Sequence, residues 1–263
     1  MTTDVSPPRF ALVQQSAIFA GRLLTKWRRD PLIPLQSLLF PTILLFIYYM
    51  LVSTSMKRLT GSDNLDVVVA MCALAGGMAG SLAAALAIPD ERDNGLLSRF
   101  WMMPVHRASA LLGTLTAEAA RTLVATVVIT LVGMLFGLRF GGGPAAAVLF
   151  VLIPVCWVTV YALLVIVLAL SFRSRTVLTW FSTVSLGAVF ANSAVAPRDV
   201  IPDWLYPAIR FQPMSSTIES MKALARDGFA IRELSWTLAW MVVLAVVVGV
   251  SAMRSYRKAA QSG

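Results

Sequence analysis

The chain has 263 residues, of which 58% are hydrophobic and only 13% are charged, and its mean hydropathy is +0.77. Soluble domains carry about 25% charged residues, so the composition excludes an ordinary soluble domain and indicates an integral membrane protein. The net charge of +9 does not indicate nucleic-acid binding, because the lysines and arginines lie at the edges of apolar stretches, where they set membrane orientation.

Residues 1–31 predict an amphipathic leader helix on the cytoplasmic surface of the membrane. Its apolar stripe, at spacings of three and four, consists of Phe10, Val13, Ala17, Ala20, Leu24 and Trp27. Arg22 and Lys26 occupy another face. A helix with an apolar and a basic face lies in the headgroup plane, and an ordinary solvated leader helix is the alternative. The leader has no cleavable signal pattern, so we expect the first spanning helix to act as an uncleaved insertion signal.

Six apolar stretches are long enough to cross the hydrocarbon core, which requires about 20 helical residues. They are 32–52, 67–88, 111–136, 145–170, 176–196 and 234–253. The predicted fold class is therefore all-α integral membrane, with a six-helix domain at 32–253 and a cytoplasmic tail at 254–263. Six spans place both termini on one side. If that side is cytoplasmic, the inner segments carry 13 Lys and Arg and the outer segments 8, so the positive-inside rule predicts cytoplasmic termini in the inner membrane.

The second and third stretches carry features of close packing. Gly76 and Gly80 are four residues apart, a spacing that lets two helices approach closely but does not identify the partner helix. Glu118 and Arg121 share one face of the third stretch. Each alone would cost roughly 3 kcal/mol at mid-bilayer. We interpret them as a self-neutralising pair near the cytoplasmic boundary, with contact to the preceding loop as the alternative.

The fifth stretch is the least apolar of the six. It contains Ser182, Ser185 and Asn192, and a helix with such a polar face is not expected to meet lipid on all sides. The sequence therefore predicts that this helix lines a cavity or packs at a helix interface.

An external segment, 197–230, follows the fifth stretch. Its four prolines forbid one continuous helix. The aromatic residues Trp204, Tyr206 and Phe211 suit a membrane interface. A helical stripe then consists of Met214, Ile218, Met221 and Ala225. We interpret the segment as a broken, partly re-entrant lid, and a simple aromatic-rich loop is the alternative.

The sequence lacks the residue patterns of common catalytic and cofactor sites. It has no G-x-x-x-x-G-K-[ST] phosphate-binding loop and no G-x-S-x-G elbow. Its one histidine, His106, and its two cysteines do not form a zinc-ligand pattern. Cys72 and Cys156 are predicted to be small buried apolar residues. We therefore predict no catalytic residue, metal or cofactor in this chain.

The loop at 89–110 concentrates charge between two apolar stretches. Its acidic start, at Asp90 to Asp93, predicts the beginning of a short helix, because carboxylates favour helix N-termini. An apolar face follows, and Pro104 ends the helix. A rigid helix with aromatic side chains, held across the inner ends of two spans, suits a cleft on a soluble partner.

The same loop resembles that of type-2 ABC exporter permeases. The segment DERDNGLLSRFWMMPVHRASALLG, at 90–113, has the family's acidic-basic-acidic start, glycine, paired leucines and proline. The segment IPDWLYPAIRFQPMSSTIESMKAL, at 201–224, resembles the family's proline-aromatic pattern before its last span. The resemblance covers essentially the whole chain. It looks closest to the daunorubicin-resistance permeases of actinobacteria, including mycobacterial exporters of drugs and of envelope lipids such as phthiocerol dimycocerosate.

The resemblance implies an export permease that moves hydrophobic drugs or cell-envelope lipids out of the cytoplasm or inner leaflet. Separate nucleotide-binding subunits would bind ATP and Mg²⁺, and a second permease, identical or paralogous, would complete the pathway. Residues implied to contact the ATPase subunit are Glu91, Arg92, Gly95, Leu97, Phe100, Trp101 and Pro104. The connecting helix would carry Arg22, Lys26 and Trp27. The substrate path or dimer interface would include Gly76, Gly80, Ser182, Ser185 and Asn192, and the lid Trp204, Tyr206 and Phe211.

Three other functions would each require features that differ from this expectation. Export of a lipid-linked glycan by the same architecture would predict polar and sugar-stacking residues in the pathway, and the sequence has few. A membrane enzyme would need clustered acid, nucleophile or metal-ligand groups near an interface. A non-transporting scaffold would lack a tightly bound ATPase.

Overall fold

The computed structural model describes residues 9–29, 31–51, 64–93, 107–172, 174–194, 201–228 and 231–261. These ranges contain helices and turns without strands, so the all-α prediction is confirmed for them. The helices are α1 (Arg9–Arg29), α2 (Leu32–Leu51), α4 (Leu65–Asp93), α6 (Arg107–Leu135), α7 (Gly143–Ser171), α8 (Arg175–Phe190), α9 (Tyr206–Phe211), α10 (Pro213–Arg226) and α11 (Ile231–Gln261).

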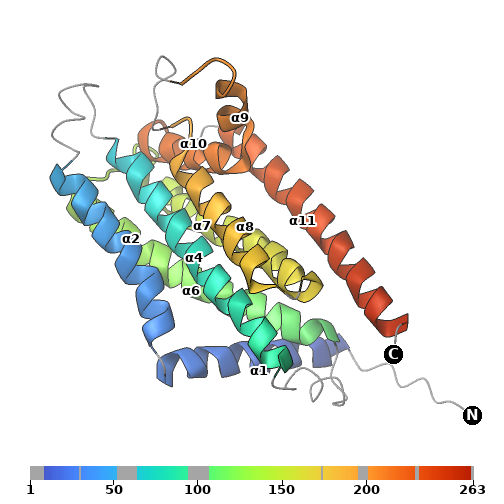
Figure 1. Ribbon diagram of the computed structural model, residues 1–263. Coiled ribbons are helices and arrows are strands. Elements are labelled where there is room, and N and C mark those ends of the chain that lie inside the picture. The colour runs from blue at the N-terminus through green and yellow to red at the C-terminus, as the bar shows by residue number, and fades with distance from the viewer. Residues whose placement is uncertain are drawn as a thin grey trace, which may run out of the picture.

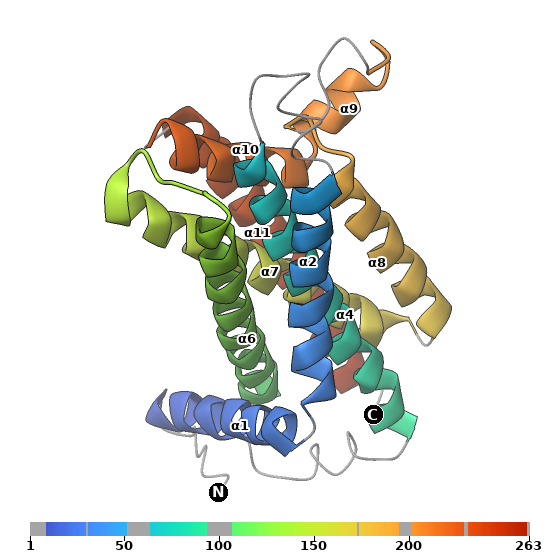
Figure 2. The same cartoon turned by 90° about the vertical axis from the view of Figure 1, so that its left-hand side faces the viewer.

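The long helices form an up-and-down bundle with a crossing helix at each end (Figure 1). α1 lies across one end of the bundle, where α4 and α11 end and α6 begins (Figures 1 and 2). α9 and α10 lie at the opposite end, between the end of α8 and the start of α11. The leader helix and the last helical residues therefore lie at the same end of the bundle.

Four of the described helices are long and apolar enough to span a membrane. They are Leu65–Leu86 in α4, Ser109–Leu135 in α6, Gly143–Ser171 in α7 and Ile231–Ser251 in α11. α2 contributes a shorter apolar helix, Leu38–Met50, and α8 has only 16 residues. The predicted count of six spans is thus not confirmed: α8 ends at Phe190, before the predicted boundary at 196, because the chain turns there.

α4 is the central helix of the bundle. It packs against α2, α6, α7, α8 and α10, and 78% of its most apolar window is buried. Small residues make this possible, because a helix surrounded by neighbours has room for few large side chains. At Gly77 an added methyl group would lie 2.5 Å from a methyl of Val158 and 3.2 Å from the methyl of Thr122.

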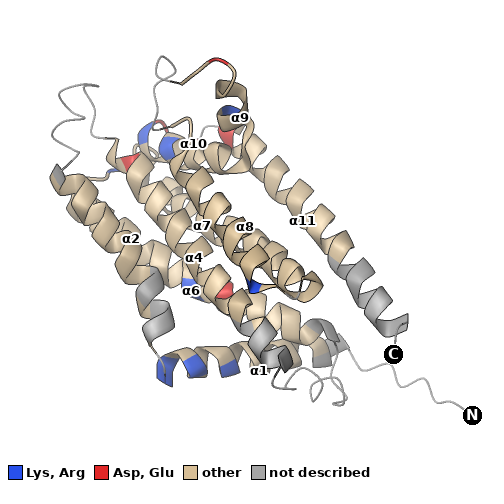
Figure 3. Ribbon diagram, viewed as in Figure 1, with Lys and Arg blue, Asp and Glu red and all other residues tan. Residues whose placement is uncertain are grey.

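The outer surface of the bundle is strongly apolar. Large hydrophobic side chains are exposed along α2, α6 and α11, including Phe40, Leu131 and Val242. Only 17% of the apolar window of α11 is buried. Soluble monomers rarely expose contiguous apolar patches of this extent, whereas lipid tails solvate such a surface. Figure 3 shows the charged residues gathered toward the two ends of the bundle, apart from a few inside it.

Three details of the sequence interpretation are corrected. α4 continues to Asp93, so the acidic run that begins at Asp90 ends a long helix rather than starting a short one, although Pro89 removes a helical N–H. Cys72 is buried as predicted, but Cys156 is exposed, because it lies on the outward face of α7. α11 continues to Gln261, so most of the segment assigned as a tail extends the last helix.

Candidate functional site

A buried charge cluster joins α4 to α6 in the interior of the bundle. Arg121 Nη2 lies 2.6 Å from Glu118 Oε2 and donates to the Gly77 carbonyl oxygen at 3.1 Å. Ser81 Oγ donates to the same carboxylate oxygen at 3.1 Å. The charged side chains are 4% and 1% exposed. The pairing of Glu118 with Arg121 is thereby confirmed, and its further contacts are to α4.

Glu118 lies about a third of the way along the apolar window Ser109–Leu135 and Arg121 nearly halfway along it, so both are deeper than a boundary position. Not all of the cluster's polar atoms are satisfied: Glu118 Oε1 and Arg121 Nε and Nη1 have no hydrogen-bond partner among the described residues. Pairing lowers the cost of burying both charges, but does not remove it.

Gly80 fits against this cluster. A methyl group added at Gly80 would overlap the Arg121 guanidinium, so the small residue is required by contact within the chain. Gly76 is buried on the same helix. The expected close approach of helices is thus found between α4 and its own neighbours, and a role for either glycine at a permease–permease interface stays a prediction.

The expected ATPase contact falls mainly on residues outside the described ranges. Glu91 and Arg92 lie in the last turn of α4, and their side chains are not described. Gly95, Leu97, Phe100, Trp101 and Pro104 lie outside the described residues. The described ends of this loop, at Asp93 and Arg107, are the end of α4 and the start of α6, so the loop joins the two helices that share the buried charge cluster.

The predicted connecting helix, α1, packs across the first turns of α6 (Figure 2). The contact is close because α6 has Gly113 there: an added methyl group would lie 2.8 Å from the Ser16 carbonyl oxygen and 3.2 Å from the Ala20 amide nitrogen. Arg22 and Lys26 are exposed and Trp27 is half-buried.

The apolar stripe predicted for α1 is only partly covered by protein. Ala20 is 6% exposed, whereas Val13 and Leu24 are 68% and 44% exposed. The face against α6 also includes Ser16 and Phe19, which the spacing pattern had not selected. The stripe therefore borders the packed face, and its exposed part is free to meet lipid while Arg22 and Lys26 lie on another side of the helix.

The polar residues predicted on the fifth stretch point into the same chain. Ser182, Ser185 and Asn192 are 4%, 8% and 1% exposed. Asn192 has a structural contact at the end of α8: its Oδ1 accepts from the Ala194 amide at 3.0 Å. Ser185 Oγ donates to the Phe181 carbonyl oxygen at 2.8 Å and lines a cavity. The interpretation of α8 as a helix whose polar side packs inward agrees with this arrangement.

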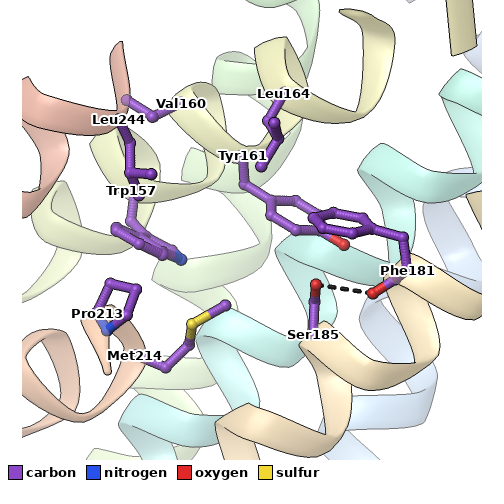
Figure 4. Close-up of a pocket in the computed structure, with 9 residues that line it drawn as sticks. All are labelled: Trp157, Val160, Tyr161, Leu164, Phe181, Ser185, Pro213, Met214 and Leu244. Carbon is purple, nitrogen blue, oxygen red and sulfur yellow. Dashed lines mark hydrogen bonds between the residues drawn. The ribbon is translucent and has the colours of Figure 1, made fainter. Parts of the chain in front are cut away.

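The cavity has a volume of about 160 Å³ and lies between α7, α8, α10 and α11 (Figure 4). Its lining consists of Trp157, Val160, Tyr161, Leu164, Phe181, Ser185, Pro213, Met214 and Leu244. Trp157 and Tyr161 are 2% and 4% exposed. The Trp157 Nε1 has no hydrogen-bond partner among the described residues, whereas the Tyr161 hydroxyl has Ser182 and Ser185 as hydrogen-bonding neighbours. Sequence reasoning missed Trp157 and Tyr161, although two aromatics four apart on a mostly aliphatic helix were a usable signal.

The segment predicted as a lid contains a broken helix, as its prolines had indicated. α9 ends at Phe211 and α10 begins at Pro213, with Gln212 in an extended conformation between them. Trp204 and Phe211 are 78% and 59% exposed, and Tyr206 lies beneath the Arg210 guanidinium, 6.0 Å from the ring centroid. The predicted stripe is buried: Met214, Ile218, Met221 and Ala225 are 8%, 0%, 0% and 4% exposed.

α10 is hydrogen-bonded to the helices around it. Gln212 Nε2 donates to the Ala188 carbonyl oxygen of α8 at 3.1 Å. Ser220 Oγ lies 2.7 Å from Thr237 Oγ1 of α11. The Ala225 carbonyl oxygen accepts from Gly141, before α7, at 2.9 Å. α10 is therefore an integral part of the bundle.

Among the described residues, no group of three or more His, Cys, Asp or Glu side chains is placed to hold a metal ion. The groups described above are suited to packing, to charge neutralisation and to holding an apolar ligand. They do not include a paired acid and base at an accessible surface.

Comparison with known proteins gives one family and two kinds of relative. The family model of the ABC-2 type transporter matches residues 13–224. "Probable doxorubicin resistance ABC transporter permease protein DrrC", from two strains of Mycobacterium tuberculosis, is 30% identical over 247 residues, which cover 94% of this chain and 90% of the relative. A Cyanophora paradoxa protein named as a transport permease, ycf38, is 23% identical over 82% of this chain and 75% of its own length.

Proposed function

The chain belongs to the ABC-2 type transporter family, and from that premise we propose that it exports hydrophobic drugs or cell-envelope lipids from the cytoplasm or inner leaflet. It is a membrane permease, a transport component rather than an enzyme. The proposed substrate class is supported by the similarity to DrrC, a protein named for doxorubicin resistance, over 94% of this chain.

The proposed energy source is ATP hydrolysed by a separate nucleotide-binding subunit, which also binds Mg²⁺. The sequence has no phosphate-binding loop of the G-x-x-x-x-G-K-[ST] kind, which supports a partner in this role. A second permease, identical or paralogous, completes the proposed transport pathway.

The proposed docking site for the ATPase subunit is the loop between α4 and α6, with α1 beside it. The hydrogen bonds between the Glu118–Arg121 pair and α4 support this assignment, because a push on the loop would move two helices that are joined in the bundle interior. The exposed Arg22 and Lys26 of α1 lie at the same end of the bundle.

The proposed topology has six spans with both termini in the cytoplasm of an inner membrane. α2 and α8 would be the fifth and sixth spans, in addition to the four longer ones. α2 has 20 residues, which extend about 30 Å as a helix, and α8 runs beside α4. The basic residues of α1 and of the C-terminal end of α11 favour the cytoplasm for the end at which both lie.

The proposed substrate path runs beside α4 and α8 toward the lid. Gly76 and Gly80 would set the close packing along it, and Ser182, Ser185 and Asn192 would form its polar border. The aromatic residues Trp204, Tyr206 and Phe211 would restrict return of the substrate at the outer end. The exposure of Trp204 and Phe211 supports a position at the membrane interface.

The test of export uses the permease co-expressed with its ATPase subunit, with doxorubicin and a fluorescent phospholipid as alternative substrates. Glu91→Ala and Phe100→Ala should leave membrane insertion unchanged, while export and substrate-stimulated ATPase activity fall. Leu135→Ala is the matched control, because Leu135 is 84% exposed on the outer surface.

Normal export in both loop variants would contradict the docking role. Absence of any copurifying ATPase after gentle extraction would contradict the exporter and favour a scaffold.

Topology is tested with single cysteines after Cys72 and Cys156 are replaced by alanine. Asp203→Cys should react with a membrane-impermeant maleimide in intact cells, whereas Ser174→Cys should react only after permeabilisation. Both positions are exposed, so access depends on the side of the membrane. The reverse labelling pattern would invert the proposed orientation.

A further inference from the structure

The cavity between α7, α8, α10 and α11 contains an unusual combination of groups. Its volume is about 160 Å³, and the Trp157 Nε1 beside it has no hydrogen-bond partner among the described residues. In Figure 4 the indole nitrogen of Trp157 points into the space enclosed by the labelled side chains. Tyr161 stacks against Phe181, with ring centroids 6.2 Å apart.

The unpartnered indole N–H of Trp157 specifies the polar part of an occupant. Polar groups in a folded interior are ordinarily hydrogen-bonded, since a buried donor that loses water without replacement is destabilising. The indole N–H is a donor only. The Tyr161 hydroxyl has Ser182 and Ser185 as hydrogen-bonding neighbours, because the Ser185 oxygen can still accept after it donates to the Phe181 carbonyl oxygen. The group complementary to the indole N–H is therefore an acceptor oxygen.

The rest of the wall specifies an apolar body. Val160, Leu164, Met214 and Leu244 present aliphatic or thioether surface to the cavity. A cavity of about 150 Å³ accommodates benzene, whereas one water occupies about 30 Å³ of the liquid. A single water could bond to one donor but would leave most of the space empty. One ring, or a short length of chain, matches the volume.

We propose that this cavity binds an apolar ring or chain segment that carries an acceptor oxygen, such as a ketone or ester carbonyl, with the Trp157 N–H as the donor. Two sources share this chemistry: the ester of a membrane phospholipid, and a hydrophobic compound in transit. Binding at this site does not depend on export, so a failure of the transport proposal would leave it unaffected.

The test compares two probes of similar size in the purified full-length permease in detergent. Acetophenone has a carbonyl acceptor, and ethylbenzene does not. Acetophenone should bind more tightly and raise the unfolding temperature more. Trp157→Phe should weaken acetophenone binding about two- to tenfold, which is the loss of one hydrogen bond, and leave ethylbenzene binding nearly unchanged.

Two further variants make the result specific to the cavity. Trp180→Phe removes an indole that is 67% exposed on α8 and should change neither affinity. Leu244→Trp should fill the cavity and abolish binding of both probes. Equal affinity of the wild-type protein for acetophenone and ethylbenzene would overturn the proposal, and so would no binding of either.

The source of the natural occupant is distinguished in nanodiscs. If the occupant is a phospholipid ester, acetophenone binding should be suppressed in ester-linked lipid and restored in ether-linked lipid of the same headgroup and chain length. If the occupant is a compound in transit, acetophenone should bind equally in both lipids. Failure to bind in either lipid, after binding in detergent, would overturn the proposal for the membrane-embedded protein.

Discussion

Arg226 holds α10 to α4 by donating two hydrogen bonds to Asp66, a residue 160 positions earlier in the chain. Arg226 Nε lies 2.6 Å from Asp66 Oδ2, and Nη2 lies 3.0 Å from Oδ1. The carboxylate is in the first turn of α4 and the guanidinium in the last turn of α10, so each charge also complements its helix dipole. Hydrogen bonding to Asp66 raises the pKa of the Arg226 guanidinium.

Arg226→Ala should destabilise the folded permease by on the order of 1–3 kcal/mol, because it leaves the buried Asp66 carboxylate without its partner. The measurement is thermal unfolding in detergent. Arg210→Ala is the control, since Arg210 is exposed and surface substitutions usually change stability by less than about 0.5 kcal/mol. Equal effects of the two substitutions would show that the ion pair contributes little.

Gly80→Ala should destabilise the bundle by roughly 1–3 kcal/mol, the usual cost of adding volume to a packed core. The added methyl group would displace the Arg121 guanidinium, which is already engaged by Glu118 and Gly77. Gly249→Ala is the matched control, because nothing lies within 4 Å of the added methyl group. That control should be neutral or stabilising by about 0.5–1 kcal/mol. A Gly80→Ala protein as stable as the control would mean that Arg121 relaxes without cost.

Arg121→Ala should cost about 3–5 kcal/mol, because Glu118 would remain buried without its partner. The double variant Glu118→Leu with Arg121→Leu should recover most of that loss, since apolar replacements of buried pairs are often neutral. Folded yield and unfolding temperature measure both effects. If the double variant also exports normally, the pair is structural; if it is stable but uncoupled, the pair transmits movement of the loop. A double variant no more stable than Arg121→Ala would contradict the explanation by an unpaired charge.

Gly113→Leu should separate α1 from α6, because the added side chain would meet the α1 backbone at Ser16 and Ala20. The measurement is maleimide labelling of Ala20→Cys after the native cysteines are replaced. Ala20 is 6% exposed, so labelling should be slow until Gly113→Leu is introduced. Gly21→Ala is the control, since its added methyl group meets nothing within 4 Å. Slow labelling in the Gly113→Leu protein would show that α1 stays docked.

The sequence predicted the buried face of α10 correctly because that face is a property of local spacing. Met214, Ile218 and Met221 lie on one side of any helix that contains them, and only one side of α10 can be buried. The prediction for α1 was less accurate, because the part of its apolar side that is buried depends on a neighbouring helix and not on local spacing. Both Val13 and Ala20 lie on its apolar side, but the α6 surface at Gly113 covers one and leaves the other exposed.

The sequence predicted some individual residues of the candidate site, but not the contacts that those residues make with other helices. The Glu118–Arg121 pair followed from a spacing of three, which places both charges on one helical face. Its bonds to Ser81 and the Gly77 carbonyl oxygen depend on how α4 and α6 are aligned. The spacing of Trp157 and Tyr161 marks one face of a helix, but the cavity beside that face exists only between helices and cannot be predicted from the spacing alone. The proposed coupling residues remain predictions.

The sequence by itself determined the membrane class, most of the helices and the family resemblance, because hydrophobicity, helical spacing and short motifs are local properties of a chain. The tertiary structure decided which helix lies at the centre, which side of each helix is covered, and where polar groups such as Arg226 and Asp66 meet. These outcomes depend on the shapes of all the helices together. Helices of similar apolarity differ little in their preference for lipid, so steric fit and a few buried polar contacts select their neighbours.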